Sequence, residues 1–302
     1  MIRAIRVLAP NRSVYTLEGT NSWVVGGGPT IVIDPGPATR EHLDELERAA
    51  GKVAHVLVTH HHGDHAEGAA AFAKRVGAPL HAWRLEGAER IRDGAAFEAP
   101  GAELVATHTP GHTADHVCFH SPGDGALFTG DTVVGRGTTF IDPPDGDLAR
   151  YIVSLERLLG LGPRTIYPGH GPVVFDAEAK LREYLEHRAD RERQIVDALA
   201  EGPRSVRDLV AAIYSQDHAP DVLPLAARSA MAHLVKLRAE GKAAANGRAD
   251  VATWALIEAK SCMRCGKPVK GRGNYCGSCL VIMLQEGHVP PARDERSAAP
   301  DG

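Results

Sequence analysis

The sequence predicts an α/β protein in which a large catalytic domain precedes smaller modules. Three observations predict this class. The chain has 302 residues, more than one average domain needs. Short β-type and helical segments alternate over residues 1–176, with histidines and aspartates in the loops between them. After about Ala177 this alternation gives way to long charged helices.

Alternating or continuous apolar runs bounded by Gly- and Pro-containing turns predict the strands of the first domain. They cover residues 2–8, 22–25, 30–33, 53–58, 103–107, 117–120, 126–129 and 165–167. Apolar residues at helical spacing predict helices over 41–50, 66–76 and 148–159. In most cases the candidate ligand lies at or just after a strand end, where loops can reach a common cleft.

Residues 177–258 have the element order of a winged helix. Helices are predicted over 180–201, 205–214 and 224–240, and a β-hairpin follows around Asn246-Gly247. Residues 259–285 are predicted to form a small zinc ribbon, because two CxxC pairs in a reducing compartment favour one structural ion held by four thiolates. Its ligands are Cys262, Cys265, Cys276 and Cys279. The tail over 286–302 is expected to be disordered.

Bulk composition narrows the function classes. A hydrophobic content of 43% and a charged content of 24% are ordinary for a soluble globular protein. The first eleven residues lack the apolar core of a signal peptide, and nothing approaches the roughly 18 apolar residues of a membrane span. We therefore expect a cytoplasmic protein without a membrane partner. A net charge of -4 gives no global argument for nucleic acid, although local basic patches remain compatible with it.

The histidine-rich loops predict a metal centre. One stretch packs four imidazoles and a carboxylate into seven residues directly after a strand: Thr59-His60-His61-His62-Gly63-Asp64-His65. Further candidates occur in separate Gly-containing turns as His112, Asp131 and His170. Imidazole nitrogen and carboxylate oxygen are ligands that a divalent ion such as zinc accepts. Surface histidines without metal are the alternative, but seven candidates in this order disfavour it.

The number of candidates fits two ions that share a water molecule. We expect His60, His62 and His112 to bind one ion, and Asp64, His65 and His170 to bind the other. Asp131 can bridge the two. A bridging water is deprotonated near neutral pH, which predicts a hydroxide nucleophile that Asp64 orients as the catalytic residue. His61 is expected to point away. Zinc is the predicted ion, although iron and manganese accept the same ligands.

These motifs resemble those of the metallo-β-lactamase-fold hydrolases. His60-x-His62-x-Asp64-His65, then Gly111-His112, Gly130-Asp131 and Gly169-His170, match that family in order and approximate spacing over roughly residues 1 to 175. The resemblance implies an αββα sandwich with a dinuclear site at one edge of two facing sheets. Asp131 speaks against the true β-lactamases, which lack an aspartate bridge there. The full set favours the glyoxalase II, ribonuclease Z and related branches.

Two segments look like the branch known as β-lactamase-like protein 2, which also carries a C-terminal winged helix. They are Thr16-Leu17-Glu18-Gly19-Thr20-Asn21-Ser22 and Gly111-His112-Thr113-Ala114-Asp115-His116. The animal member is described as an endoribonuclease for single-stranded RNA, whereas bacterial relatives are mostly assigned as metal-dependent hydrolases. The resemblance suggests that Asn21 and His116 bind substrate near the cleft. Turn formation and strand capping explain these two residues equally well.

The second and third modules leave several roles open. The predicted third helix carries Arg228, Lys236 and Arg238, but nearby acids offset them, and we favour a packing or substrate-shaping role over duplex reading. The ribbon loop concentrates positive charge at Arg264, Lys267, Lys270 and Arg272. It could contact phosphate, stabilise the fold or bind a protein.

The sequence therefore predicts a dinuclear zinc hydrolase that cleaves an ester-type bond. A phosphodiester in single-stranded RNA is suggested by the branch resemblance and the basic ribbon. A thioester or small-molecule ester, as in glyoxalase II, is suggested by the metal set alone. A third possibility, from another class, is a nucleic-acid-binding protein that acts through the winged helix and the ribbon. The sequence carries no indication of the oligomeric state.

Overall fold

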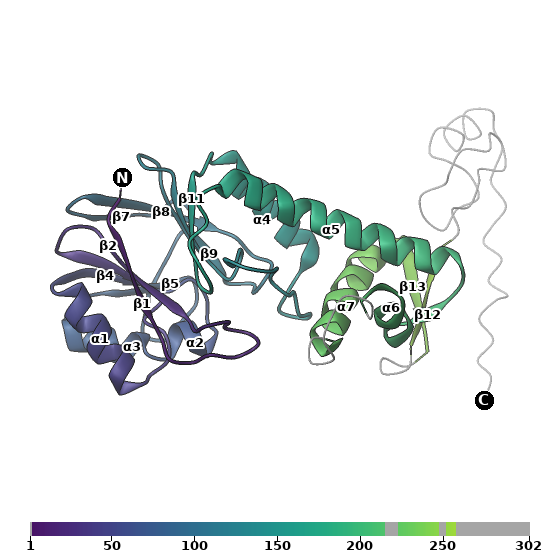
Figure 1. Cartoon of the computed structure of the whole chain (residues 1–302), viewed down its shortest axis with the longest axis horizontal. Helices are drawn as coiled ribbons and strands as arrows, with labels where there is room; N and C mark the ends of the chain where they lie inside the picture. The colour runs from purple at the N-terminus through teal and green to yellow at the C-terminus, as the bar shows by residue number, and fades with distance from the viewer. Residues whose placement is uncertain (1, 215–222, 248–251, 258–302) are drawn as a thin grey trace, which may run out of the picture.

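Two β-sheets face each other in the first part of the chain, with helices on their outer sides, and a long helix leads to a second, smaller unit (Figure 1). The computed structural model describes residues 2–214, 223–247 and 252–257. The four-cysteine ribbon and the tail predicted from the sequence lie outside these residues. The first part is the αββα sandwich that the sequence resemblance implies.

The first sheet has six strands in chain order, β1-β2-β3-β4-β5-β6. β1, β2 and β3 pair antiparallel, and β3 to β6 pair parallel. The strands are β1 (Ala4–Leu8), β2 (Asn21–Val25), β3 (Thr30–Ile33), β4 (Val53–Leu57), β5 (Leu80–Ala82) and β6 (Glu89–Arg90).

The second sheet has five strands in the order β11-β10-β9-β8-β7, in which only β10 and β11 pair parallel. Its strands are β7 (Ala96–Ala99), β8 (Ala102–His108), β9 (Val117–Ser121), β10 (Ala126–Gly130) and β11 (Thr165–Pro168). The sequence patterns predicted most of these strands. They missed β5, β6 and β7, because two to four residues are too few to establish an alternation.

Side-chain alternation along the strands builds the layers. On β3, Val32 packs toward the outer helices, whereas Ile31 and Ile33 pack between the two sheets. The outer helices of the first sheet are α1 (Arg40–Ala50) and α3 (Ala69–Val76). The single helix predicted over 66–76 is in fact two, since the short α2 (Gly63–Ala66) precedes α3. Gly68 separates them and lies against the backbone of residues 36 and 37, where a Cβ would come within 3.0 Å of Gly36 O.

Two helices cover the outer side of the second sheet, α4 (Leu148–Gly160) and the first half of α5 (Ala177–Ala200). Asp147 and Asp176 cap their N-termini by accepting hydrogen bonds from backbone amides. Leu181 and Tyr184 of α5 are buried in this layer, while Ile195 and Leu199 lie in the core of the second unit. The predicted domain boundary at residue 177 coincides with the start of α5, which contributes to both cores.

The second unit contains the expected helices and hairpin of a winged helix. A capping box at Ser205 and Asp208 begins its short helix. Its remaining elements are β12 (Arg204–Ser205), α6 (Val206–Ile213), α7 (Leu223–Ala239), β13 (Ala243–Asn246) and β14 (Thr253–Leu256). α7 also touches the first domain, because Ala232 is buried with the residues of α4 and α5. Among the described residues, no helix combines the length and apolar character needed to span a membrane.

Candidate metal centre

Four loops that leave strand ends converge at one edge of the sandwich. β8 and β10 both pair antiparallel with β9, and β11 pairs parallel with β10, so these three strands run in the same direction. Their carboxyl ends therefore meet at one edge, where the loop after β4 joins them. The seven predicted ligands follow these strand ends: His60, His62, Asp64 and His65 after β4, His112 after β8, Asp131 after β10 and His170 after β11.

The loops bring three imidazoles into one group. Nε2 of His60 lies 3.0 Å from Nδ1 of His62, and Nε2 of His112 lies 3.1 Å from the same Nδ1 atom. Each of the three residues offers one ring nitrogen, and these nitrogen atoms all lie within 4.8 Å of one another. This is the first of the two predicted ligand sets.

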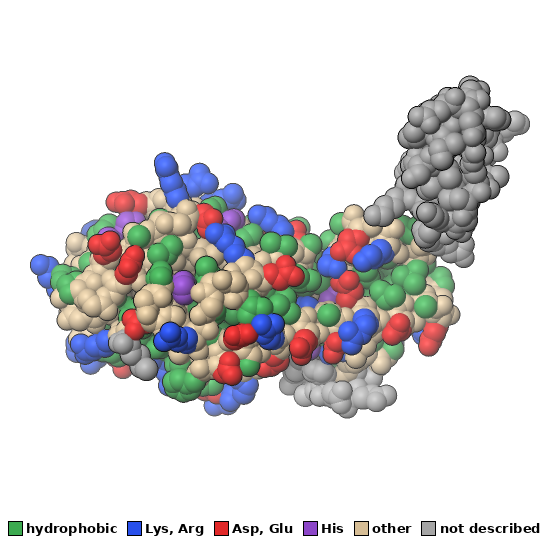
Figure 2. Space-filling model, turned by 90° about the horizontal axis from the view of Figure 1, so that it is seen from above, with side chains coloured by type: hydrophobic (Ala, Val, Ile, Leu, Met, Phe, Trp, Pro, Cys, Tyr) green, Lys and Arg blue, Asp and Glu red, His purple; other side chains and the backbone are tan. Residues whose placement is uncertain are grey.

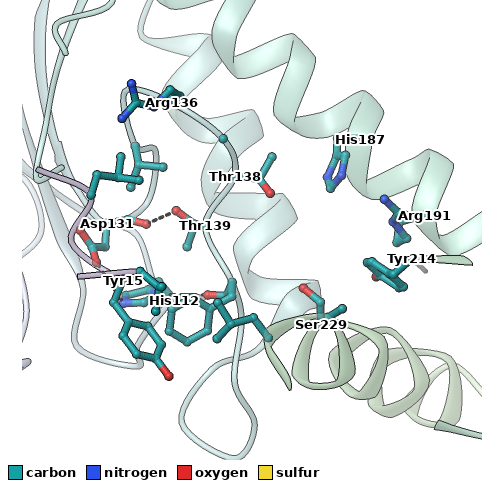
Figure 3. A pocket seen from close by; sticks show the side chains of 17 residues that line it. Tyr15, His112, Asp131, Arg136, Thr138, Thr139, His187, Arg191, Tyr214 and Ser229 are labelled. Atoms are coloured by element: carbon teal, nitrogen blue, oxygen red, sulfur yellow. Dashed lines mark hydrogen bonds and ion pairs between the residues drawn. The ribbon is translucent and has the colours of Figure 1, made fainter. Parts of the chain in front are cut away.

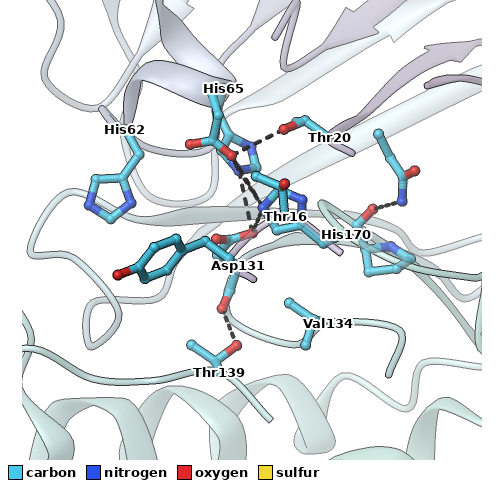
Figure 4. A network of polar contacts seen from close by, with 12 residues as sticks. Thr16, Thr20, His62, His65, Asp131, Val134, Thr139 and His170 are labelled. Atoms are coloured by element: carbon cyan, nitrogen blue, oxygen red, sulfur yellow. Dashed lines mark hydrogen bonds and ion pairs between the residues drawn. The ribbon is translucent and has the colours of Figure 1, made fainter. Parts of the chain in front are cut away.

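A second group combines two imidazoles with a carboxylate (Figure 4). Nε2 of His65 and Nε2 of His170 are 3.3 Å apart, and each lies 3.3 Å from Oδ2 of Asp64. Ligands about 2.0–2.1 Å from a tetrahedral zinc ion lie roughly 3.3 Å from one another. The three atoms thus form one face of such a tetrahedron.

Asp131 lies between the two groups. Its Oδ1 atom is 3.4 Å from Nε2 of His65 and 3.2 Å from Nε2 of His170, while Oδ2 is 3.7 Å from Nε2 of His112. Oδ1 is buried and accepts no hydrogen bond from the described part of the chain. A carboxylate with one oxygen toward each group fits a bridge between two cations.

The second nitrogen of each imidazole fixes which nitrogen faces the centre. Carbonyl oxygens accept from Nδ1 in two cases: Gly19 O lies 3.2 Å from His170, and Phe140 O lies 3.2 Å from His112. Through these contacts each ring is held with its Nε2 atom toward the centre. Such outer contacts are a general feature of histidines that bind metals.

Two further rings, those of His65 and His60, depend on Asp34, which is not among the predicted site residues. Its Oδ2 atom accepts from Nδ1 of His65 at 2.9 Å and from Oγ1 of Thr59 at 2.8 Å. Oγ1 of Thr59 then accepts from Nδ1 of His60 at 3.0 Å. One buried carboxylate thereby orients a ligand in each group. The available signal was an aspartate directly after a fully buried strand.

The electrostatics of the two groups differ. Burial lowers the pKa of His60, and lowers that of His62 to about 4, so both rings are in the neutral form that binds metal. Burial alone would lower the pKa of His170 as well, but Asp131 and Asp64 raise it to about 9. Burial alone would also raise the pKa of Asp131, yet His170 and His65 hold it well below its usual range. The anionic half thus attracts positive charge, which bound cations would supply.

Comparison with known proteins places this geometry in a family. The profile described as "Metallo-beta-lactamase superfamily" matches residues 15–90 and 80–170, more than half of the chain. The chain belongs to the metallo-beta-lactamase superfamily. A second profile, "Beta-lactamase associated winged helix domain", matches residues 205–254 and confirms the predicted winged helix. As a member of this superfamily the protein is a hydrolase, in agreement with the prediction.

Curated relatives cover most of the metallo-beta-lactamase chain. An "Atrochrysone carboxyl ACP thioesterase" from Aspergillus chevalieri is 34% identical over 273 residues, which are 84% of this chain and 87% of that protein. A "Beta-lactamase-like protein 2 homolog" from Drosophila melanogaster is 34% identical over 273 residues, 82% and 91% of the two chains. The recognition of the β-lactamase-like protein 2 branch is thereby confirmed.

A solved structure supports the fold of both parts of this superfamily member. A beta-lactamase domain protein from Burkholderia ambifaria superposes with a TM-score of 0.71 at 22% identity, over 85% of this chain and 91% of that one. Because the coverage extends beyond the family domain, the αββα sandwich and the winged helix both find a counterpart.

The structure gives scaffolding contacts to Asn21 and His116, the two residues suggested to bind substrate. Asn21 is fully buried, and its Nδ2 atom donates to Pro168 O and to Gly171 O at 2.9 Å each. His116 is fully buried, and its Nε2 atom accepts from the amide of Asp131 at 3.1 Å. Neither residue lines the cavity described below. Both instead hold loops of the metallo-beta-lactamase site in place.

His61 lies outside both groups, as expected from its place between two ligands. Its Nδ1 atom is 2.9 Å from Oδ1 of Asp115, which also accepts from Oγ1 of Thr113 at 2.7 Å. The ring is 45% exposed, and its Nε2 atom lies 3.9 Å from Oδ2 of Asp145. These contacts fasten the loop after β4 to the loop after β8.

A cavity of about 390 Å³ begins at the candidate metal ligands and continues to the winged helix (Figure 3). His112 and Asp131 line one end of it. The rings of Tyr15 and Phe140 lie 5.6 Å apart beside that end. Apolar side chains line much of the remaining wall, namely Val14, Leu17, Val134, Leu225 and Ala226. The winged helix therefore contributes directly to the cavity of the catalytic domain.

The basic residues of α7 have partners within the chain. Arg228 pairs with Asp142 of the catalytic domain, and Lys236 pairs with Glu192 and Glu240 at 2.8 Å. The guanidinium of Arg238 lies 5.7 Å from the ring centre of Trp254. On the face drawn in Figure 2, basic and acidic side chains are interspersed. The three basic side chains of α7 thus contact other parts of the chain, and the packing or substrate-shaping role of this helix stays a prediction.

Proposed function

We propose that this protein hydrolyses an acyl thioester, or a closely related ester, with the help of two zinc ions. One observation carries the proposal. Seven donor side chains form two groups that share Asp131, and an apolar cavity opens from that point. The site combines a place for two Lewis acids with room for an acyl chain.

Each side chain has a role in the proposal. His60, His62 and His112 bind the first ion, and Asp64, His65 and His170 bind the second. Asp131 bridges the two and keeps their separation fixed. Facing ring nitrogens lie 3.0–3.3 Å apart in the two groups, close enough to share a cation, which supports this assignment.

The ions, when bound, would lower the pKa of a water molecule and polarise the carbonyl group of the substrate. Asp64 is suited to orient that water, because it is 29% exposed whereas Asp131 is 14% exposed. Oγ1 of Thr20 donates to Oδ2 of Asp64 at 3.1 Å and fixes the carboxylate. The water oxygen attacks the carbonyl carbon, the carbon–sulfur bond breaks, and the proton passes to the leaving thiolate.

The cavity favours an acyl substrate over RNA. Its apolar wall matches an acyl chain, whereas a strand of RNA needs a basic groove along its backbone. Relatives named as acyl carrier protein thioesterases support the same substrate class. The aromatic pair of Tyr15 and Phe140 would flank the acyl group beside His112.

The proposal is tested with purified protein and three substrates: an acyl thioester, its oxygen ester and single-stranded RNA. Each is incubated with and without a chelator, and metal is counted by elemental analysis. We expect chelator-sensitive thioester hydrolysis. Two zinc ions per chain should remain after Cys262 and Cys265 are replaced by Ser to remove the proposed ribbon ion. Cleavage of RNA with no turnover of either ester would overturn the substrate assignment.

A nucleic-acid-binding function is the competing class. It predicts affinity for duplex DNA that falls steeply with salt concentration. We expect the described winged helix not to bind duplex DNA even at low salt. Arg228 and Lys236 of α7 form ion pairs with acidic residues of this chain, and α7 packs against the catalytic domain. Salt-sensitive binding that survives removal of residues 259–302 would contradict this expectation.

A further inference from the structure

The end of the cavity remote from the metal centre has a different chemistry. Side chains of α5, α7 and the end of α6 line it, and Figure 3 shows several of them pointing into the same space. The polar residues there are His187, Arg191, Tyr214 and Ser229. None of them is predicted from the sequence, because only the packing of three helices brings them together.

Two arginines of α5 have no carboxylate partner among the described residues: Arg191, which lines this end of the cavity, and Arg188, three residues before it. Arg191 donates to Oε1 of Gln194 at 2.7 Å and to Ile213 O at 3.4 Å. Arg188, which is only 2% exposed, donates to Thr139 O. The Nε atoms of both are buried and make no hydrogen bond to the described chain. Other arginines of α5 do pair with acids, as Arg193 does with Asp190 at 2.6 Å.

The geometry holds one of these charges toward the cavity. His187 and Arg191 are four residues apart on α5 and therefore lie on one face of the helix. The guanidinium of Arg191 lies 4.1 Å from the ring centre of Tyr214, a cation–π contact that helps to fix its position. Nδ1 of His187 is buried without a described partner. Burial, together with Arg188 and Arg191, lowers the pKa of that ring to about 4, so it is neutral at pH 7.

Arg191 is half-buried and has no carboxylate partner among the described residues, so an anionic group in the cavity would meet a positive charge that is only partly solvated. We propose that Arg191 and His187 bind an anionic group of the substrate, a phosphate or a carboxylate, at the end remote from the scissile bond. The inference rests on the proposed function and narrows it to anionic acyl thioesters. The apolar wall formed by Val134, Leu225 and Ala226 lies along the same cavity and suits the uncharged middle of such a molecule.

The test varies the thiol while the acyl group stays the same. The substrates are butanoyl thioesters of pantetheine, which is neutral, of 4′-phosphopantetheine, which carries a phosphate, and of glutathione, which carries carboxylates. We expect kcat/KM for at least one anionic thioester to exceed that for the neutral one by about tenfold or more, the usual effect of a charge-assisted hydrogen bond. The phosphate and glutathione arms identify which anion is preferred.

In Arg191→Gln the fall in kcat/KM for the preferred anionic substrate should exceed the fall for the neutral substrate by about tenfold. A higher KM should account for this difference. Arg191→Lys should keep part of the preference for the anionic substrate, because lysine retains the positive charge. Arg193→Gln is the matched control, since it removes the same charge two residues away at a side chain that is 70% exposed. An equal preference for neutral and anionic substrates in the unaltered protein would overturn the inference while leaving the thioesterase function intact.

A binding measurement separates the inference from the proposed function. Calorimetric titration with the free thiols requires no turnover. Tighter binding of 4′-phosphopantetheine or glutathione than of pantetheine, lost in Arg191→Gln and kept in Arg193→Gln, supports the anion site even if no thioester is hydrolysed. Equal affinities for the three thiols, or an Arg191→Gln protein that binds as tightly as the unaltered one, refute it.

Discussion

Oδ2 of Asp34 lies 2.9 Å from Nδ1 of His65, and both side chains are removed from solvent. The same carboxylate reaches His60 through Thr59, so a residue that touches neither proposed ion orients a ligand for each. Its backbone φ of 51° is unusual for a residue other than glycine. The fold holds this strained position because the carboxylate accepts three hydrogen bonds there.

Asp34→Ala is therefore expected to weaken metal binding by about 10- to 100-fold, the usual effect of losing an outer partner of a metal-binding histidine. Competition with a fluorescent chelator measures the affinity. Asp44→Asn is the control, since Asp44 is an exposed carboxylate that pairs with Arg75 on the surface. Unchanged metal affinity in Asp34→Ala would mean that packing alone orients His65.

Asp131→Ala should reduce hydrolysis to the background rate while the far-ultraviolet circular dichroism spectrum stays unchanged. The physical reason is that this carboxylate faces ligands of both groups, so its removal leaves neither ion with a bridge. Elemental analysis should show fewer than two ions per chain at the catalytic site. Full activity in a folded Asp131→Ala protein would exclude the bridging role.

The sequence predicted the strand ends that carry the ligands because the ligand types, the turns and the strand patterns are all local signals. Asp34 illustrates what was missed. Its role depends on the loop from His60 to His65 folding back over β3, a contact between segments about thirty residues apart. For Asn21 and His116 the sequence fits substrate binding and a structural role equally well, and their complete burial becomes visible only in the folded chain.

The anion-binding end of the cavity could not be predicted for a related reason. His187 and Arg191 are two polar residues in a charged helix, where most such residues are solvated. Their position follows from α5 belonging to two cores at once, so that its middle turns lie over the cavity. Tyr214 reaches the same space from α6, twenty-three residues beyond Arg191. No local pattern encodes this meeting.

Contacts between α5 and α7 should make the free energy of unfolding depend on pH. Hydrogen bonds from His233 and Lys236 lower the pKa of Glu192 from 4.5 to about 2. Because this pKa is lower in the folded state, the ionised carboxylate contributes stability fully above pH 4.5, and the contribution is lost as the pH falls toward 2. The contribution is about 1–2 kcal/mol after allowance for partial exposure.

Urea denaturation of the unaltered protein and of Glu192→Gln at pH 7, 4.5 and 3 measures this dependence. The difference in unfolding free energy between the two should be largest at pH 7 and should shrink at pH 3. Glu183→Gln is the control, because Glu183 is 57% exposed on the same helix. A difference that stays constant across the three pH values would show that Glu192 stabilises the junction through packing, not through charge.

Gly169 provides a steric test of the proposed centre. A Cβ atom at this position would lie 2.7 Å from Cε1 of His65 and 2.8 Å from Oδ1 of Asp131, so Gly169→Ala must displace a ligand of the second group. We expect metal affinity to fall by about tenfold or more, and overpacking to cost about 1–3 kcal/mol of stability. Gly123→Ala is the control, since a Cβ atom there meets nothing within 4 Å. Because no charge or hydrogen-bonding group changes in either variant, a loss of metal confined to Gly169→Ala would come from displacing the ligands next to this position, His65, Asp131 or His170. Equal metal affinity in the two variants would argue that these side chains do not hold the ion.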